Sequence, residues 1–277
     1  MTSRPAWSSQ FESDAIRELH ALGPIGEISR DWAWGDSEGE GVRIAVIDSG
    51  IEGDHAALGS SVQGGVVIGP DPSSGEFVAT PESPPIDLFG HGTACAGIIH
   101  KIAPNAQIFS VRVLGEDLTA KAKQFATGLR WAIEQDMDVV NLSLSTSKSA
   151  YYGIFHKLAD EAYFNNVILV SAVNNIPGPS FPSLYSSVIS VAAHEGQDPF
   201  IYYYNPAPPV EFGAPGFDLE VAWKDQSTCT TTGNSFAAPH LAGIVARICS
   251  KHPELTPFQV KTILFACASN TRPSPAG

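Results

Sequence analysis

The sequence has few basic residues and no long apolar run. Its 277 residues include 16 lysines and arginines against 29 aspartates and glutamates, a formal net charge of −13. Nucleic-acid and anionic-membrane binders need a basic surface, so this charge argues against both kinds of partner. No stretch approaches the roughly 18 consecutive apolar residues of a transmembrane helix, and the N-terminus lacks the apolar core of a signal peptide. We therefore expect a soluble protein that binds neither nucleic acid nor membrane.

Cysteines are also scarce, and they lie far apart. They occur at Cys95, Cys229, Cys249 and Cys267. This spacing matches neither a disulfide framework nor a metal site, and three of the four lie in apolar helical or near-helical contexts typical of buried thiols. We expect free thiols, no bound metal and a cytoplasmic location, because a reducing compartment suits such cysteines. A secreted protein whose signal peptide had been removed would have the same sequence.

The apolar residues alternate between strand-like and helix-like runs. We expect strands at 42–48, 107–113, 138–144, 167–173 and 188–193, and helices near 91–101, 119–136, 151–164, 235–250 and 256–266. This alternation predicts an α/β fold with a mostly parallel central sheet and helices on both faces. With 43% hydrophobic residues, the chain can bury the core of one compact domain. We place that domain at 41–277, after an N-terminal extension and lead-in segment at 1–40.

Two further segments are expected to be variable loops beside the functional site. Residues 69–87 are rich in proline, serine and acidic side chains, and residues 195–210 contain three consecutive tyrosines among prolines. Such compositions are typical of loops. The tyrosines could form a substrate platform or a lid over the core.

The segment GNSFAAPHLAG at 233–243 contains a serine in a position typical of a nucleophile. It places Ser235 at the start of a predicted helix, where free N–H groups and a partial positive charge favour an oxyanion. Pro239 is expected within about the first turn, where its missing N–H breaks no helical bond. Ser235 is therefore a candidate nucleophile.

A serine nucleophile needs a base and a group that orients the base. The strand in GVRIAVIDSGIE (41–52) ends at Asp48, at the sheet edge where open α/β folds bind ligands. The segment FGHGTACAGIIHKIAP (89–104) opens a helix at His91, and its small residues allow close packing. We expect His91 to act as the base and Asp48 to orient it.

The motifs DSG at Asp48, HGT at His91 and GNSFAAPH at Ser235, in this order, resemble the three signatures of the subtilisin-like serine proteases, the subtilases. The likeness continues through APNAQIFSVRVLG, VVNLSLS, VISVAA and FGAPG, and covers roughly residues 25–265. It implies a three-layer subtilisin-like fold and a serine endopeptidase that works through an acyl-enzyme. Ser235 would attack the peptide carbonyl, His91 would move the proton and Asp48 would hold the imidazole.

The resemblance also implies an asparagine in the oxyanion hole. Such enzymes carry it after a small-residue strand, and NVILVSAVNN (166–175) ends in two asparagines. Register favours Asn175, because Asn174 then replaces a family glycine and asparagine readily accepts positive φ. Asn174 is the second choice. Asn234, where the family has threonine, could also donate toward the oxyanion.

Substrate in this family lies as an added strand beside a segment that aligns with Ser143, Leu144 and Ser145. The family has glycine where Ser145 stands, so a side chain there, with Ser180 on the opposite wall, predicts a narrowed primary pocket. An ordinary strand end is the alternative interpretation of the three residues.

Other subtilases carry a calcium loop inside the helix after the catalytic histidine, but here the helix runs from His91 to Ile102 without it. Ala57 also stands where relatives supply a carboxylate to the same ion. Calcium needs six or more oxygen ligands. We therefore expect no cofactor and no high-affinity calcium site, although a weaker site elsewhere stays open.

The strand before Asp48 begins after only about forty residues, so no sizeable prodomain is expected ahead of the catalytic domain. Within residues 1–24, an amphipathic helix at 10–22 could be an inhibitory or docking segment, or a surface helix packed on the domain. The expected partner is a peptide or protein substrate, and the sequence indicates no oligomeric state. A dedicated role in processing a precursor or leader peptide and general protein turnover are both consistent with it. The alternative from another class is a catalytically weak, protease-derived peptide-binding module.

Overall fold

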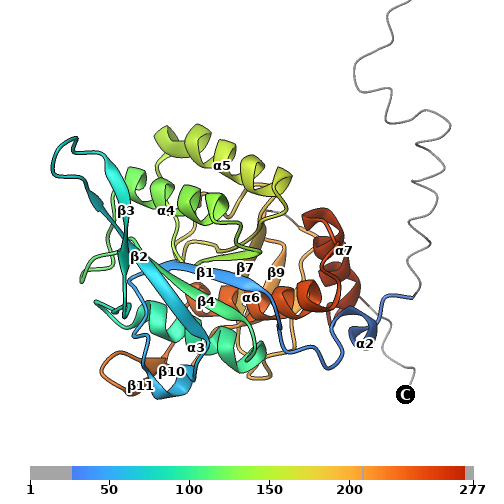
Figure 1. The fold of residues 1–277 in the computed structure, drawn as a ribbon. Coiled ribbons are helices and arrows are strands. Elements are labelled where there is room, and N and C mark those ends of the chain that lie inside the picture. The colour runs from blue at the N-terminus through green and yellow to red at the C-terminus, as the bar shows by residue number, and fades with distance from the viewer. Residues whose placement is uncertain (1–26, 208, 272–277) are drawn as a thin grey trace, which may run out of the picture.

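A computed structural model describes residues 27–207 and 209–271 (Figure 1). Within these residues the main sheet has nine strands, in the order β3-β2-β4-β1-β5-β6-β7-β9-β8. All neighbours are parallel except the two edge pairs, β2 with β3 and β8 with β9. The strands are β1 (Arg43–Asp48), β2 (Val62–Pro70), β3 (Phe77–Glu82), β4 (Gln107–Arg112), β5 (Val139–Leu142), β6 (Ile168–Ala172), β7 (Ile189–His194), β8 (Tyr203–Tyr204) and β9 (Phe212–Pro215).

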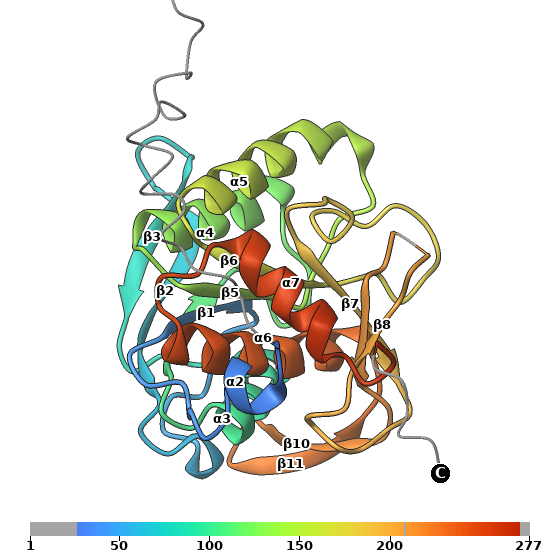
Figure 2. The same ribbon diagram turned by 90° about the vertical axis from the view of Figure 1, so that its right-hand side faces the viewer.

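Helices cover both faces of this sheet (Figure 1). One face carries α4 (Ala122–Glu134) and α5 (Tyr152–Phe164), and the other carries α3 (His91–Ile102) and α6 (Asn234–Lys251). Helix α7 (Pro257–Cys267) packs against α6, and the short α2 (Arg30–Ala33) packs against α7, as the turned view in Figure 2 shows. The three-layer fold predicted from the sequence is confirmed.

Three short elements complete the described fold. A second sheet pairs β10 (Leu219–Trp223) with β11 (Ser227–Thr231) as an antiparallel hairpin, and β10 contacts α3. Two 3₁₀ helices lie at Ala56–Leu58 and Ser149–Tyr151. Among the residues that the structure describes, no helix is long and apolar enough to cross a membrane.

The sequence of β1 explains its central place. Ile44 and Val46 pack into the apolar cluster under α3 and α6, whereas Ala45 and Ile47 pack into the cluster under α4 and α5. A strand that is apolar on both sides must be covered on both faces. Asp48 follows this run and is 0% exposed, so the strand carries a buried carboxylate to the edge where the parallel strands end.

The five predicted strands and five predicted helices are present, with ends shifted by at most a few residues. The prediction of a free loop at 69–87 was wrong, because β3 pairs antiparallel with β2. The pattern was hard to read because β2 contains several glycines and β3 contains a proline. At 195–210, Tyr202 is fully buried and its hydroxyl donates to Leu264 O at 2.9 Å, as the lid interpretation requires. The predicted inhibitory or docking segment at 1–24 lies outside the described residues.

Candidate active site

The first pair of site residues joins the end of β1 to the start of α3. The His91 Nδ1 atom lies 2.7 Å from Asp48 Oδ1 and 2.9 Å from Asp48 Oδ2. Asp48 is 0% exposed and His91 is 7% exposed. Because an ionised carboxylate only accepts hydrogen bonds, Nδ1 must carry the proton, and the neutral ring has its lone pair at Nε2. His91 can therefore accept a proton on the side away from Asp48.

The charge around His91 strengthens it as a base. Burial lowers the pKa of His91, but the negative charge and hydrogen bond of Asp48, together with the charge of Asp87, outweigh this effect. The pKa of His91 therefore lies above its usual value of 6.5. The charges of Asp48 and Asp87 would therefore stabilise the imidazolium that forms when His91 accepts a proton.

Two glycines permit the close approach of α3 to β1. A Cβ atom on Gly92 would lie 2.0 Å from Gly50 O, and one on Gly50 would lie 2.0 Å from Ile86 O. Gly50 also has a φ of +104°, a backbone conformation that residues other than glycine rarely adopt. Small residues after Asp48 and His91 are therefore a steric condition for bringing the pair together.

Asp87 holds the start of α3 in place. Its carboxylate accepts hydrogen bonds from the Ser49 hydroxyl, the backbone N–H groups of Phe89 and Gly90, and both the N–H and the hydroxyl of Thr93. Sequence reasoning missed this residue. The signal that could have found it is an aspartate four residues before His91, just ahead of a helix N-terminus that attracts negative charge.

Ser235 is the second residue of α6, so its N–H has no acceptor within the helix. Ser235 and His91 line the same cavity of about 420 Å³, which we call the catalytic cleft. Within the described part of the chain, no hydrogen bond joins Ser235 Oγ to His91 Nε2. Such bonds are often long until substrate binds. The structure places His91 and Ser235 on one cleft, with Asp48 buried behind His91.

The Ser235 carbonyl depends on a side chain from another strand. Pro239 is the sixth residue of α6, not part of the first turn as expected, and it lacks the N–H that would bond to the carbonyl four residues earlier. The Ser143 hydroxyl takes this role and donates to Ser235 O at 2.7 Å. Asn141 Nδ2 in turn donates to Ser143 Oγ at 3.0 Å. Ser143 therefore holds the backbone carbonyl of the candidate nucleophile Ser235.

Cys95 lies beneath the same residues. Its Sγ atom is 3.3 Å from Ser143 Oγ, 3.6 Å from Ser235 O and 3.8 Å from Asp48 Oδ2. Burial and the charge of Asp48 raise the pKa of the Cys95 thiol well above its usual range. Cys95 is thus a neutral packing thiol. Cys95, Cys229 and Cys249 are free thiols, as expected.

The two candidate oxyanion residues both line the catalytic cleft. The Asn234 N–H donates to Asn175 Oδ1 at 2.9 Å. Because a backbone N–H can only donate, the Asn175 atom that faces it must be the oxygen, and its NH₂ group must lie on the other side. Asn174 Oδ1 instead accepts from Ile176 N at 3.4 Å. Asn174 is not among the residues with positive φ, so that expectation was wrong.

Asn234 ties three segments together instead of facing the cleft. Its Nδ2 donates to Val173 O and Asn174 O, both at 3.2 Å, and its Oδ1 accepts from Ala193 N at 2.8 Å. Both ends of the amide are therefore engaged. The expectation that Asn234 could donate to an oxyanion is corrected, and its role is to hold the loop that carries Asn175.

The three residues of the predicted substrate segment differ in role: Ser143 bonds to the Ser235 carbonyl, whereas Leu144 and Ser145 form part of the cleft wall. Ser143 is only 8% exposed and its hydroxyl is used internally. Leu144 and Ser145 line the cleft, and within the described residues their backbone groups make no hydrogen bond. Ser180 is 1% exposed and its hydroxyl accepts from Asn174 N at 3.0 Å. Ser180 therefore lies beneath the wall, not on it, which corrects its expected place.

Residues from β10 and from the segment before α3 form a further side of the cleft. Phe89 and Trp223 line it, and their ring centroids lie 5.6 Å apart in an edge-on contact. Neither aromatic residue was singled out in the sequence, because β10 and α3 are distant in the chain. They add an apolar surface beside His91.

Known proteins resemble this chain over most of its length. Residues 39–276 match the family model described as the Subtilase family. The chain is 33% identical over 252 residues to the minor extracellular protease Epr of Bacillus subtilis, an alignment that covers 87% of this chain and 36% of that protein. It is 28% identical over 248 residues to subtilisin DY of Bacillus licheniformis, covering 84% and 85%. The chain thus spans little more than a third of Epr.

A solved structure shares the fold. The crystal structure of a cold adapted subtilisin-like serine proteinase superposes with a TM-score of 0.66 and covers 85% of this chain and 87% of that chain. The sequence identity is 24%, so this likeness concerns the fold alone.

Proposed function

This chain belongs to the subtilase family, and on that premise we propose that it is a serine endopeptidase with Ser235 as nucleophile, His91 as general base and acid, and Asp48 as orienting carboxylate. The observation that carries the proposal is the buried pair of His91 and Asp48, which opens onto the same cleft as Ser235. The relatives include enzymes named as proteases and subtilisins.

In the proposed first step, Ser235 Oγ attacks the carbonyl carbon of a peptide bond while His91 Nε2 takes its proton. His91 then gives the proton to the leaving amine, and the C–N bond breaks to leave an acyl-enzyme. Water attacks this ester in the second step, again with His91 as base, and releases the acid and the free serine. Asp48 stabilises the imidazolium in both steps.

The oxyanion would be held by two donors. One is the Ser235 N–H, which has no acceptor within α6. The other is the Asn175 NH₂ group, whose direction is set by the bond from Asn234 N to Asn175 Oδ1. The positive end of α6 adds to this stabilisation, because its first N–H groups point toward the developing charge.

The substrate would be an extended peptide that pairs with the backbone at Leu144 and Ser145. The unpaired backbone groups of these two residues support this placement. We further propose a dedicated role in processing a precursor or leader peptide, because the side chain of Ser145 narrows the cleft where the family has glycine. A cytoplasmic location, with no calcium cofactor, remains part of this proposal.

The test of the catalytic assignment is labelling with a fluorophosphonate probe, read by intact mass. We expect one adduct on the parent and none on Ser235→Ala. The matched control is Ser227→Ala, which removes an exposed serine on β11. This variant should still be labelled at Ser235. Absence of an adduct on the folded parent, together with tight peptide binding and no product, would favour the alternative of a peptide-binding module.

Digestion of casein tests the processing role separately. A dedicated processing enzyme should leave casein intact while cleaving selected members of a peptide library. Rapid and unselective digestion would instead support general turnover and contradict the processing role.

A further inference from the structure

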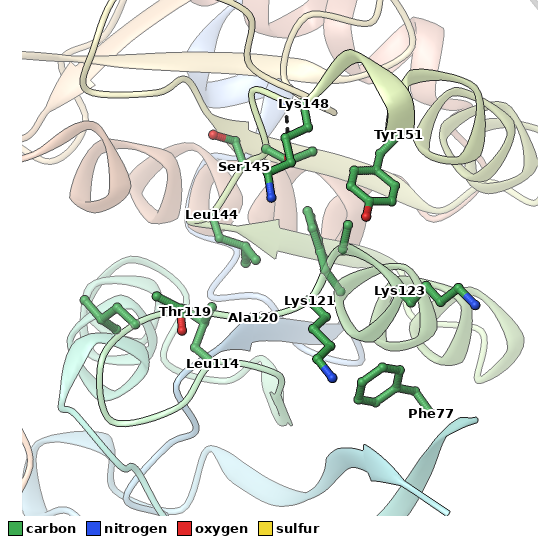
Figure 3. A pocket seen from close by; sticks show the side chains of 14 residues that line it. Phe77, Leu114, Thr119, Ala120, Lys121, Lys123, Leu144, Ser145, Lys148 and Tyr151 are labelled. Carbon is green, nitrogen blue, oxygen red and sulfur yellow. Dashed lines mark hydrogen bonds between the residues drawn. The ribbon is translucent and has the colours of Figure 1, made fainter. Parts of the chain in front are cut away.

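A second cavity, of about 520 Å³, adjoins the catalytic cleft (Figure 3). We call it the side cavity. Four residues line both spaces: Leu114, Leu118, Leu144 and Ser145. A peptide paired with Leu144 and Ser145 would therefore have side chains in both, with the scissile bond near Ser235 and a more distant residue in the side cavity.

The side cavity has an apolar floor and a basic rim. Its apolar lining includes Phe77 from β3 and Phe125 from α4. Three lysines also line it, Lys121, Lys123 and Lys148, and no acidic residue is among the described residues that do so. In Figure 3 the Lys148 side chain reaches down beside Ser145, the Lys121 ammonium extends near Phe77 on the opposite side, and the Lys123 ammonium points away.

These lysines stand out because their ammonium groups have no hydrogen-bond or ion-pair partner among the residues that the structure describes. The described residues include 13 lysines and arginines. Nine of them hydrogen-bond to a carbonyl or carboxylate or, in the case of Arg130, form an ion pair with a carboxylate: Arg30, Arg43, Lys101, Arg112, Arg130, Lys224, Arg247, Lys251 and Lys261. The four whose side chains form no hydrogen bond or ion pair within the described chain are Lys121, Lys123, Lys148 and Lys157, and three of these line the side cavity.

The composition makes this clustering informative. The chain has 29 acidic residues, so carboxylates that could pair with surface lysines are abundant. Asp117, on the loop before Lys121, has both carboxylate oxygens bonded to Thr119 instead. The Lys121 ammonium lies over the Phe77 ring, with Nζ 5.8 Å from the ring centroid. Two ammonium groups therefore face a partly apolar space next to the catalytic cleft without a counter-charge from the described chain.

Resting on the proposed function, we propose that the side cavity selects substrates with an acidic side chain several residues from the scissile bond, its carboxylate lying between Lys121 and Lys148. The apolar floor would accommodate the methylene groups of that side chain or an apolar neighbour. The net charge of −13 opposes anionic ligands at long range. The preference must therefore be local, with an acidic residue favoured at one position and disfavoured or neutral elsewhere.

The experiment moves one glutamate, against glutamine as the neutral reference, through each position of a quenched fluorescent peptide with a fixed cleavage site. We expect kcat/KM to rise about tenfold for glutamate at one position, at least two residues from the scissile bond, since each exposed ion pair contributes a few-fold. The effect should shrink at high salt. Equal rates for glutamate and glutamine at every position would overturn the inference.

Variants locate the effect. The double variant Lys121→Gln/Lys148→Gln should lose the preference for glutamate, whereas Lys157→Gln, which removes an equivalent exposed charge on α5, should keep it. The variant Lys148→Glu should favour lysine at the same position of the peptide. Retention of the full glutamate preference in the double variant would contradict the assignment.

Two readouts separate this inference from the proposed function. Fluorophosphonate labelling of Ser235 should be the same in the parent and the double variant. In Ser235→Ala, which cannot turn over, the glutamate peptide should bind about tenfold more tightly than the glutamine peptide by fluorescence anisotropy. Equal binding there would overturn the inference even if the parent labels normally, and a parent that never labels would overturn only the catalytic proposal.

Discussion

Replacing Ser143 with alanine tests how the chain supports Ser235. The carbonyl of Ser235 has no helical N–H partner, because the residue four positions later is Pro239. The change would leave the Ser235 carbonyl and Asn141 Nδ2 without their present partners. A buried polar group left unpaired costs about 1–3 kcal/mol, so two such groups predict a loss of about 2–6 kcal/mol in the free energy of unfolding. The Cys95 thiol, 3.6 Å from Ser235 O, is a weak remaining donor and favours the lower part of that range.

A double-mutant cycle isolates the role of the proline. Alanine at position 239 restores a backbone N–H four residues after Ser235, so the carbonyl regains a donor inside the helix. The loss of the Asn141 partner is the same in both backgrounds and cancels. We therefore expect Ser143→Ala to cost about 1 kcal/mol less in the Pro239→Ala background than in the parent.

The assay is urea unfolding, with every variant built on Ser235→Ala. This background removes the hydroxyl, and with it self-digestion, but keeps the backbone carbonyl that the cycle examines. An equal cost of Ser143→Ala in the two backgrounds would refute the reasoning, because it would show that Pro239 and Ser143 act independently. In the active protein, Ser143→Ala should also lower kcat, since the nucleophile loses its support.

Four further predictions concern catalysis and stability. Asn175→Ala should lower kcat by about a hundred- to a thousandfold with little change in KM, as for loss of an oxyanion donor; full activity would reassign the donor. The pH dependence of kcat/KM should rise through a pKa above 6.5, because Asp48 and Asp87 raise the pKa of His91, and Asp87→Asn should move that rise to lower pH. The raised pKa of His91 also affects stability. Because its folded pKa lies above the unfolded value, His91 stabilises the fold below about pH 6.5, and this contribution is lost as pH rises through the folded pKa. Urea midpoints across this pH range measure the loss. A chelator should leave the melting temperature unchanged, because α3 runs unbroken from His91 to Ile102; a large fall would reveal a calcium site.

The sequence predicted the parts of the site that depend on local patterns. Asp48 follows a β-branched run, while His91 and Ser235 each stand at the start of a helix, so periodicity and helix-start signals located them. Their order also matched a known family. The strands buried on both faces were recognisable for the same reason, because a short uninterrupted apolar run is typical of a parallel strand that helices cover on both sides.

The parts that were missed depend on contacts between distant segments. Nothing near Ser143 in the chain indicates that its hydroxyl would bond to the carbonyl of Ser235, and nothing near Ser180 indicates that it would lie beneath Asn174. Asp87 gathers donors from Ser49, the residue after β1, and from the start of α3. A sequence pattern reports neighbours along the chain, whereas these roles are set by which surfaces pack together.

The position of α6 links the proposed activity to the docking of this helix. This helix packs against β5, β6, β7, β9 and α3, and 12 of its 18 residues are buried. The same helix carries Ser235 and contributes its N-terminus to the proposed oxyanion site. A chain that has not yet docked α6 lacks both the proposed nucleophile in its place and much of the packing on one face of the sheet. On the proposed assignment of Ser235, a chain whose α6 has not docked cannot cut the unfolded neighbours that are abundant during synthesis.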